Sequence, residues 1–161
     1  HTISILVENH AGVLARVAGL FARRGFNIDS LAVGVTEDEK ISRITIIADG
    51  TAYTLEQIEK QLNKLIDVIK VRHLPAEELL SRELVLIKVA CQPSQRAELI
   101  SLAEIAKAKI SDITVNTMTL ELSDSVPRIK TFEELLRPYG IKETVRTGSI
   151  AMQKGGASMK L

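Results

Sequence analysis

The chain has 161 residues, of which 45% are hydrophobic and 25% are charged. This balance is typical of folded globular proteins and excludes collagen, coiled coils and disordered chains. The 21 basic and 20 acidic side chains leave a formal charge of +1, so the composition gives no electrostatic footprint for a nucleic acid or an anionic membrane. Aromatic residues make up only 3%, which predicts an aliphatic core and no surface for stacking nucleobases.

No apolar run approaches the roughly 18 residues of a membrane span, and no signal-peptide pattern is present. The single cysteine, Cys91, follows an aliphatic run and is predicted to be a buried, inert thiol. We therefore expect a cytoplasmic protein that has no membrane partner.

The first half of the chain predicts the order βαββαβ. Alternating apolar residues favour a strand over 2–7, and helical spacing after Val13 favours a helix that ends at Gly25. Thr54 is predicted to start the next helix, because Gln57 would complete a capping box. The remaining predicted elements are strands over 26–35, 41–48 and 68–74.

The second half repeats this order. The residues after Pro75 suit a short linker over 75–82, and the chain from 153 onward is predicted to be a loose tail. Ser94 is predicted to cap the third helix. The predicted elements are strands over 83–91, 110–116, 117–123 and 141–152, with helices over 94–108 and 126–137.

The sequence thus predicts an α+β protein built from tandem ferredoxin-like βαββαβ units, a domain over 1–76 and a second over 77–161. Each unit would place two helices on one face of a four-stranded antiparallel sheet and leave the other face uncovered. Because a unit of this size buries a modest core and exposes edge strands, we expect an oligomer formed by edge pairing.

The sequence lacks the residue sets of common catalytic centres. The three histidines, His1, His10 and His73, have neither a metal-ligand partner at helical spacing nor a nearby nucleophile. No glycine-rich phosphate loop is present. We therefore predict no catalytic residue, no metal site and no cofactor in this chain. The arginines of the first helix, including Arg16, are interpreted as a solvated face or a partner contact.

The loop over 8–12 is the best candidate for a binding site. A helix N-terminus offers unpaired N–H groups and partial positive charge to a carboxylate, and Gly12 permits close approach of the backbone. Asn9 lies in this loop, and Asn27 is expected to emerge near the same edge. An α-amino acid could bind there. Propensity alone favours the alternative that Asn9 and Asn27 are turn residues and that Gly12 merely starts the helix.

The runs ENHAGVLARV over 8–17 and GLFARRGFNIDSL over 19–31 strongly resemble the small regulatory subunit family of acetohydroxyacid synthase, also called acetolactate synthase. Further agreement follows over 42–46, 55–62 and 64–68. Several linked motifs in order are more specific than a lone Asn-x-x-Gly. The second half resembles the family mainly in its size and pattern.

The resemblance implies an N-terminal ACT domain, the amino-acid-sensing version of this fold, and a C-terminal ACT-like domain. It implies a homodimer through the ACT domains and a regulatory role without chemistry of its own: activation of a catalytic large subunit and feedback inhibition by valine or another branched-chain amino acid. Thiamine diphosphate, Mg²⁺ and FAD would belong to that large subunit. The implied effector-binding residues are Asn9, Gly12, Val13, Leu14, Asn27 and Ile28.

The corresponding loop of the second unit, Cys91-Gln92-Pro93-Ser94, lacks both Asn and Gly, so no equivalent site is expected there. The alternative function is a freestanding, amino-acid-responsive transcriptional regulator. Such a protein would need a basic DNA-binding segment, and none is visible in these residues.

Overall fold

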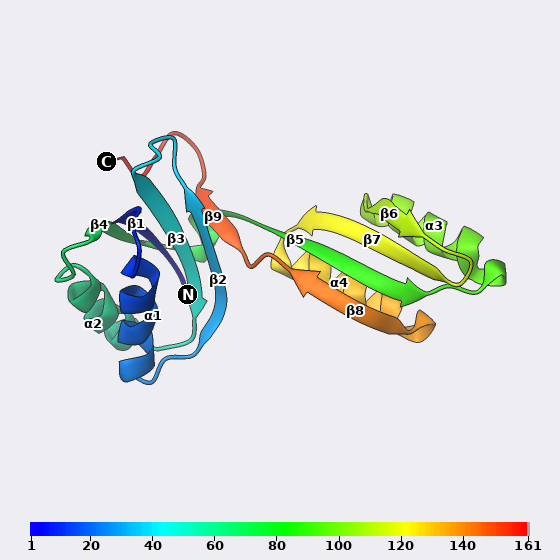
Figure 1. Ribbon diagram of the computed structural model, residues 1–161, viewed down its shortest axis with the longest axis horizontal. Helices are drawn as coiled ribbons and strands as arrows, with labels where there is room; N and C mark the ends of the chain where they lie inside the picture. The colour runs from blue at the N-terminus through cyan, green and yellow to red at the C-terminus, as the bar shows by residue number, and fades with distance from the viewer. Residues whose placement is uncertain (161) are drawn as a thin grey trace. The chain divides into compact units, whose positions relative to one another are not determined.

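The computed structural model describes residues 1–160 (Figure 1). The chain divides into two compact units. His1–Leu80 and the chain from Ser149 onward form the first, and Ser81–Gly148 forms the second. The predicted C-terminal domain extended to Leu161, and that last residue lies outside the described part.

The first unit is an antiparallel sheet in the order β2-β3-β1-β4. This is the ferredoxin-like order expected for a βαββαβ chain, with α1 and α2 on one face. Its elements are β1 (Thr2–Glu8), α1 (Val13–Arg23), β2 (Ile28–Val35), β3 (Ile41–Ala48), α2 (Ala52–Leu62) and β4 (Val68–Leu74), followed much later by β9 (Ile150–Gln153).

The core of the first unit lies between the sheet and its two helices. Ile3, Ile5 and Val7 alternate along β1 toward the helices, as predicted, and are almost fully buried. Phe21 of α1 and Ile58 of α2 pack into the same cluster. Because every member is aliphatic or Phe, this core is apolar throughout, in line with the composition.

The start of α2 differs from the prediction. Thr51, rather than Thr54, is the N-cap residue: its backbone is extended and its hydroxyl accepts from the Thr54 N–H at 3.2 Å. Thr54 lies in the first turn, where its hydroxyl donates to the Thr51 carbonyl at 2.8 Å. The helix begins at Ala52 because the Thr51 hydroxyl provides an acceptor for the Thr54 N–H, one of the first-turn donors that have no partner within the helix.

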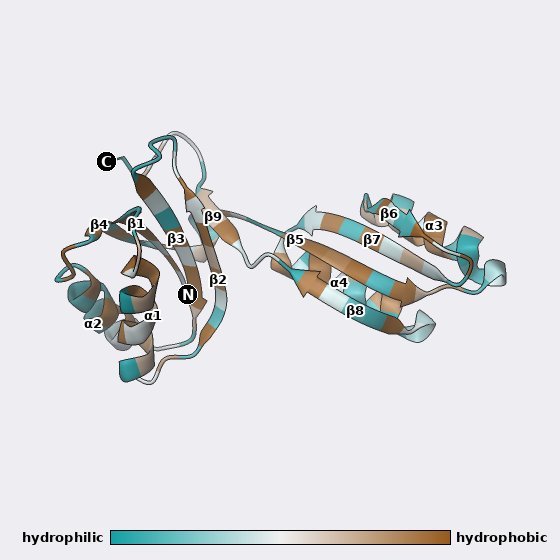
Figure 2. Cartoon of the chain, viewed as in Figure 1, coloured by the Kyte–Doolittle hydropathy of each residue, from teal (hydrophilic) through white to brown (hydrophobic). Residues whose placement is uncertain are grey.

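The second unit repeats the topology with the strand order β6-β7-β5-β8. The predicted fold class, a tandem of ferredoxin-like units, is therefore confirmed. Hydrophobic and hydrophilic residues alternate along β7 (Figure 2). The elements are β5 (Leu79–Ala90), α3 (Arg96–Ala106), β6 (Lys109–Ile113), β7 (Thr117–Asp124), α4 (Val126–Leu136) and β8 (Ile141–Arg146).

Two boundaries of the second unit differ from the sequence expectation. β5 begins at Leu79, so only Pro75 and one short 3-10 turn over Ala76–Glu78 remain of the predicted linker. The third helix begins at Arg96 after a 3-10 turn, and Gln92 rather than Ser94 caps that turn. Cys91 is 1% exposed within the apolar core, as predicted.

The end of the chain also differs. The strand predicted over 141–152 ends at Arg146, and β9 is a separate strand that belongs to the first unit. The backbone N–H of Ser149 donates to the Ser30 hydroxyl at 2.8 Å, and Lys70 Nζ donates to the Lys160 carbonyl at 2.6 Å. These bonds hold residues 149–160, which we call the C-terminal segment, against the first unit.

The C-terminal segment lies on the sheet face that was expected to be uncovered, and it is not the loose tail that its composition predicted. β9 contacts β1. The β1 side chains on the face opposite the helices are all buried; they belong to Thr2, Ser4 and Leu6. Both faces of the first sheet are thus covered. In the described part of the chain, no helix is long and apolar enough to cross a bilayer.

Candidate functional site

The loop between β1 and α1 is fixed by hydrogen bonds to the hairpin turn that joins β2 and β3. The backbone N–H of Asn9 donates to the Lys40 carbonyl at 2.8 Å, and Asn9 Nδ2 donates to the Glu39 carbonyl at 2.8 Å. The nitrogen of this amide is therefore used to position the loop. Its oxygen can accept a hydrogen bond from a ligand, and the second N–H of the amide remains a donor.

Gly12 is the N-cap residue of α1, and its φ of +86° lies in the left-handed region. Gly12 has no side chain, and among residues 1–160 no side-chain hydrogen bond caps this end. The first-turn N–H groups of α1 are therefore available to an anion, at the end where the helix dipole is positive. Val13 is 3% exposed and faces the core, whereas Leu14 is 41% exposed, so of these two predicted site residues Leu14 presents its side chain to solvent.

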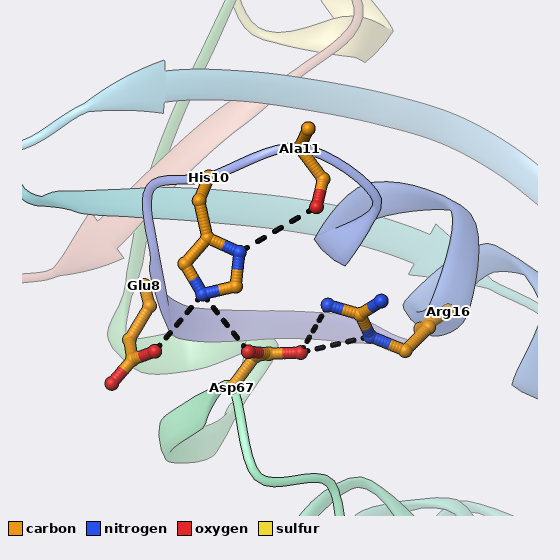
Figure 3. A network of polar contacts seen from close by, with 5 residues as sticks. All are labelled: Glu8, His10, Ala11, Arg16 and Asp67. Carbon is orange, nitrogen blue, oxygen red and sulfur yellow. Dashed lines mark hydrogen bonds and ion pairs between the residues drawn. The ribbon is translucent and has the colours of Figure 1, made fainter.

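Four charged or titratable side chains surround this helix start (Figure 3). Asp67 lies between two of them: its Oδ2 accepts from Arg16 Nε at 2.8 Å and from Arg16 Nη2, and its Oδ1 lies 3.0 Å from His10 Nε2. The same His10 nitrogen lies 3.0 Å from Glu8 Oε2. A Cβ built on Gly12 would lie 3.1 Å from Arg16 Nη1, so the guanidinium group lies over the helix start.

The hydrogen bond to Glu8 raises the pKa of His10 above its ordinary value of 6.5, with further contributions from the Ala11 carbonyl and the Asp67 charge. With His10 protonated, the two cations balance the carboxylates of Glu8 and Asp67. When His10 loses its proton, the group carries one net negative charge beside the helix start. Protonated His10 therefore favours binding of a carboxylate ligand.

Glu8, His10 and Asp67 each offer one ligand atom within 4.8 Å of the others, which is compatible with a metal ion. Arg16 already occupies one oxygen of Asp67, and His10 lies beside the other. A cation bound to the Asp67 Oδ1 atom would replace the contact with His10 and would lie beside the positive charge of Arg16. The chemistry of the group is thus that of an ion-pair network, and we assign no metal to it.

Asn27 does not lie near the same edge as Asn9, so that expectation is wrong for a single chain. Ile28 pairs with Ala48 at one end of β3, whereas Glu8 pairs with Ile41 at the other end. The 11 residues of α1, at about 1.5 Å each, separate the two ends by about 16 Å. Asn27 Nδ2 donates to Asp29 Oδ1 at 2.9 Å, and Ile28 is half-buried.

Reasoning from the sequence missed the ion-pair network. Arg16 and Asp67 are 51 positions apart, and no local pattern connects them. The sequence predicts a solvated or partner-contacting role for Arg16 and neither a metal-ligand partner nor a nearby nucleophile for His10. The signal available in the sequence was that His10 and Arg16 both lie close to Gly12. A helical wheel places Arg16 above Gly12, because the two residues are four positions apart.

Comparison with known protein families gives matches along nearly the whole chain. A model described as the AHAS small subunit-like ACT domain matches residues 3–70. A second model, described as the small subunit of acetolactate synthase, matches residues 82–155. The resemblance noted from the sequence is therefore confirmed in both units.

Individual relatives agree. The chain is 51% identical over 160 residues to a probable acetolactate synthase small subunit of Methanothermobacter thermautotrophicus, covering 99% of this chain and 95% of the relative. It is 49% identical over 155 residues to the corresponding protein of Archaeoglobus fulgidus, covering 96% and 97%. A crystal structure of the acetolactate synthase small subunit from Thermotoga maritima matches with a TM-score of 0.90 and 39% identity, covering 98% of both chains. These relatives give no support to a freestanding transcriptional regulator.

Proposed function

Because the chain belongs to the acetolactate synthase small-subunit family, we propose that it regulates a separate catalytic large subunit of that enzyme. It would activate the large subunit, and it would inhibit it when valine or another branched-chain amino acid is bound. The bond-making chemistry would take place on the large subunit, with thiamine diphosphate, Mg²⁺ and FAD bound there. We place the complex in the cytoplasm, where the free thiol of Cys91 stays reduced.

The open first turn of α1 is the observation on which the effector site rests. The carboxylate of the amino acid would accept from the N–H groups that follow Gly12, which no side chain caps. The nearby guanidinium of Arg16 and protonated His10 would add favourable charge. The ammonium group would donate to the Asn9 amide oxygen, which is the acceptor of that side chain.

Two copies of the chain would complete the site. β2 is an edge strand, and antiparallel pairing of two such strands places the Val35 end of one beside the Ile28 end of the other. The loop that contains Asn9 and Gly12 lies at the Val35 end, since β3 begins there. Pairing would thus bring the loop of one subunit and Asn27 of the partner subunit to the same end of the joined sheet. In a single chain these residues lie at opposite ends.

The apolar surface beside this edge supports the same arrangement. Leu14 of α1 and Val33 and Val35 of β2 are 41%, 49% and 62% exposed. α2 packs against β4, so α1 covers the half of the sheet nearer β2. Pairing at β2 would bury these side chains and leave a short aliphatic wall for an isopropyl group. Burying a side chain of that size contributes roughly 1.5 to 3 kcal/mol.

Selectivity among branched-chain effectors would be modest. One methylene in an apolar pocket changes binding by about 1 to 3 kcal/mol, so valine, leucine and isoleucine can compete for one site. Inhibition requires that the bound amino acid favours one arrangement of the assembly over another, with a coupling of typically 1 to 3 kcal/mol. The effector acts through that difference and not through contact with the reacting groups.

The test is reconstitution with the purified large subunit. The rate of acetolactate formation should rise when this chain is added and should fall when valine follows. Calorimetric titration of the chain alone should show valine binding, and Asn27→Ala should weaken it. Equal affinity in the unmodified chain and the Asn27→Ala variant would remove Asn27 from the site.

Gly12→Asp tests the carboxylate position. The new carboxylate would occupy the helix start and repel the ligand, so valine inhibition should be lost while activation of the large subunit persists. Valine-sensitive activity that survives this change would contradict the placement. Failure of the chain to change the rate of any large subunit would contradict the regulatory role itself.

A further inference from the structure

A cavity lies on the face of the first sheet that is opposite α1 and α2. Ser4 of β1, Arg43 of β3 and Arg72 of β4 line one side of it, and the C-terminal segment lines the other. Its volume is about 320 Å³, at the lower end of the range for small-molecule sites. All lining residues belong to the first unit.

A buried hydroxyl group faces this cavity. Ser4 is 1% exposed, and its Oγ has no hydrogen-bond partner among the described residues. Ile3 and Ile5 point into the core, so the alternation of β1 directs the Ser4 side chain to the cavity side of the sheet. Buried polar groups in folded proteins almost always have a partner, and a ligand in the cavity would supply one.

Two arginine side chains on the same wall lack a carboxylate partner. Within the described residues, neither Arg43 nor Arg72 forms an ion pair. Arg72 Nη1 reaches only neutral acceptors, the Ser158 carbonyl at 3.3 Å and Gln153 Oε1 at 3.5 Å. Since guanidinium groups keep their charge at every physiological pH, this wall is suited to an oxyanion.

The rest of the lining limits what the oxyanion can be. Leu74, Met152 and Met159 are apolar, and Glu37 and Lys160 are the remaining charged side chains. Three lining side chains are therefore cationic and one is anionic. Methionine adapts to flexible aliphatic groups, so the cavity joins a cationic wall to an apolar one. This combination matches a short aliphatic chain that ends in a carboxylate.

We propose that this cavity binds a small aliphatic carboxylate. Arg43 and Arg72 donate charge-assisted hydrogen bonds to the carboxylate, the Ser4 hydroxyl donates a further bond, and the aliphatic chain packs against Met152 and Met159. The site is separate from the effector loop and does not depend on the proposed regulatory function. Because the ligand would contact both the sheet and the C-terminal segment, it would hold that segment in place.

The test uses the full chain labelled with ¹⁵N and three probes: butyrate, the neutral 1-butanol and inorganic phosphate. Butyrate should shift the amide signals of Ser4, Arg43 and Arg72 in a saturable way, and should slow hydrogen exchange in the C-terminal segment. The same shifts should persist when valine is present in saturating amount. 1-Butanol and phosphate should bind at least tenfold more weakly, because each lacks one half of the ligand.

Arg43→Gln removes one guanidinium that forms no ion pair within residues 1–160, and it should weaken butyrate binding roughly tenfold or more. Arg24→Gln is the matched control, because Arg24 is an exposed arginine of the same unit outside the cavity. It should leave butyrate binding unchanged. Both variants should keep the dispersed amide spectrum of the unmodified chain, which shows that the unit is folded.

Three results would overturn the proposal. Unchanged butyrate affinity in Arg43→Gln would remove the cationic wall from the site. Equal affinity for 1-butanol or for phosphate would exclude an aliphatic carboxylate as the ligand class. Loss of butyrate binding in the presence of valine would show that the carboxylate binds at the effector loop.

A different outcome separates the two proposals. If valine does not bind but butyrate does, only the proposed function is contradicted.

Discussion

Gly12→Ala, compared with Gly25→Ala, separates backbone strain from loss of a binding site. Both glycines flank α1 in left-handed conformations, with φ values of +86° and +74°. A Cβ at Gly25 would meet no atom within 4 Å, whereas a Cβ at Gly12 would lie 3.1 Å from Arg16 Nη1. The two substitutions therefore share the backbone cost and differ in what the new methyl group meets.

The shared cost can be estimated. An L residue in the left-handed region loses roughly 1 to 2 kcal/mol, and the reduced freedom of the unfolded chain returns about 0.4 to 1 kcal/mol. Each variant should therefore lose about 1 kcal/mol of unfolding free energy. Arg16 is half-exposed in its pair with Asp67, so its displacement should add less than about 1 kcal/mol to the cost at Gly12.

Urea unfolding and calorimetric titration with valine are the two assays. Both variants should show similar unfolding midpoints, but only Gly12→Ala should bind valine at least tenfold more weakly, about 1.4 kcal/mol, because the methyl group blocks close approach to the first-turn N–H groups. If Gly12→Ala binds valine as tightly as Gly25→Ala does, the helix start is not the carboxylate site.

Three further predictions follow from the same structure. Because the pKa of His10 is raised, valine affinity should be highest below pH 6.5 and should decline as the pH rises through the raised pKa. Titrations with valine across this range should give a flat profile for His10→Gln. A decline that persists in this variant would exclude His10 as the source of the pH dependence. Asp67→Asn should free Arg16 and weaken pairing with His10, lowering the pKa of His10 measured by NMR; an unchanged value would assign the shift to Glu8 and the Ala11 carbonyl. Leu99→Ala should destabilise the second unit by about 2 to 5 kcal/mol in urea without changing valine affinity, since Leu99 is fully buried in that core; altered valine binding would show that the units are coupled.

Local patterns in the sequence were sufficient for most of the fold. Strand alternation in β1, β5 and β7 and apolar spacing in α1 and α4 depend only on neighbours along the chain. Four of these elements lie close to their predicted positions, whereas β5 begins earlier, at Leu79. The errors lie at boundaries where several residues compete. Thr51 and Thr54 can each cap a helix, and the choice depends on which backbone is extended.

The candidate site divides in the same way. The glycine at the start of α1 was identified from the sequence because a helix N-terminus and its missing side chain are local properties. The partners of His10 and Arg16 were not identified, because Asp67 reaches them only after β3, α2 and the turn before β4 have folded back. The opposite positions of Asn9 and Asn27 likewise follow from strand register and not from spacing.

The order of elements, the repeat and the apolar character of both cores were determined by the amino-acid sequence alone, since periodicity and turn residues act over a few positions. Only the tertiary structure decided that the C-terminal segment returns to the first unit and that Ser4, Arg43 and Arg72 share one cavity. Contacts between residues more than 70 positions apart, such as Ser30 with Ser149, depend on the summed packing of the whole chain. No local pattern specifies such contacts, because each contributes too little free energy to impose a preference on its own segment.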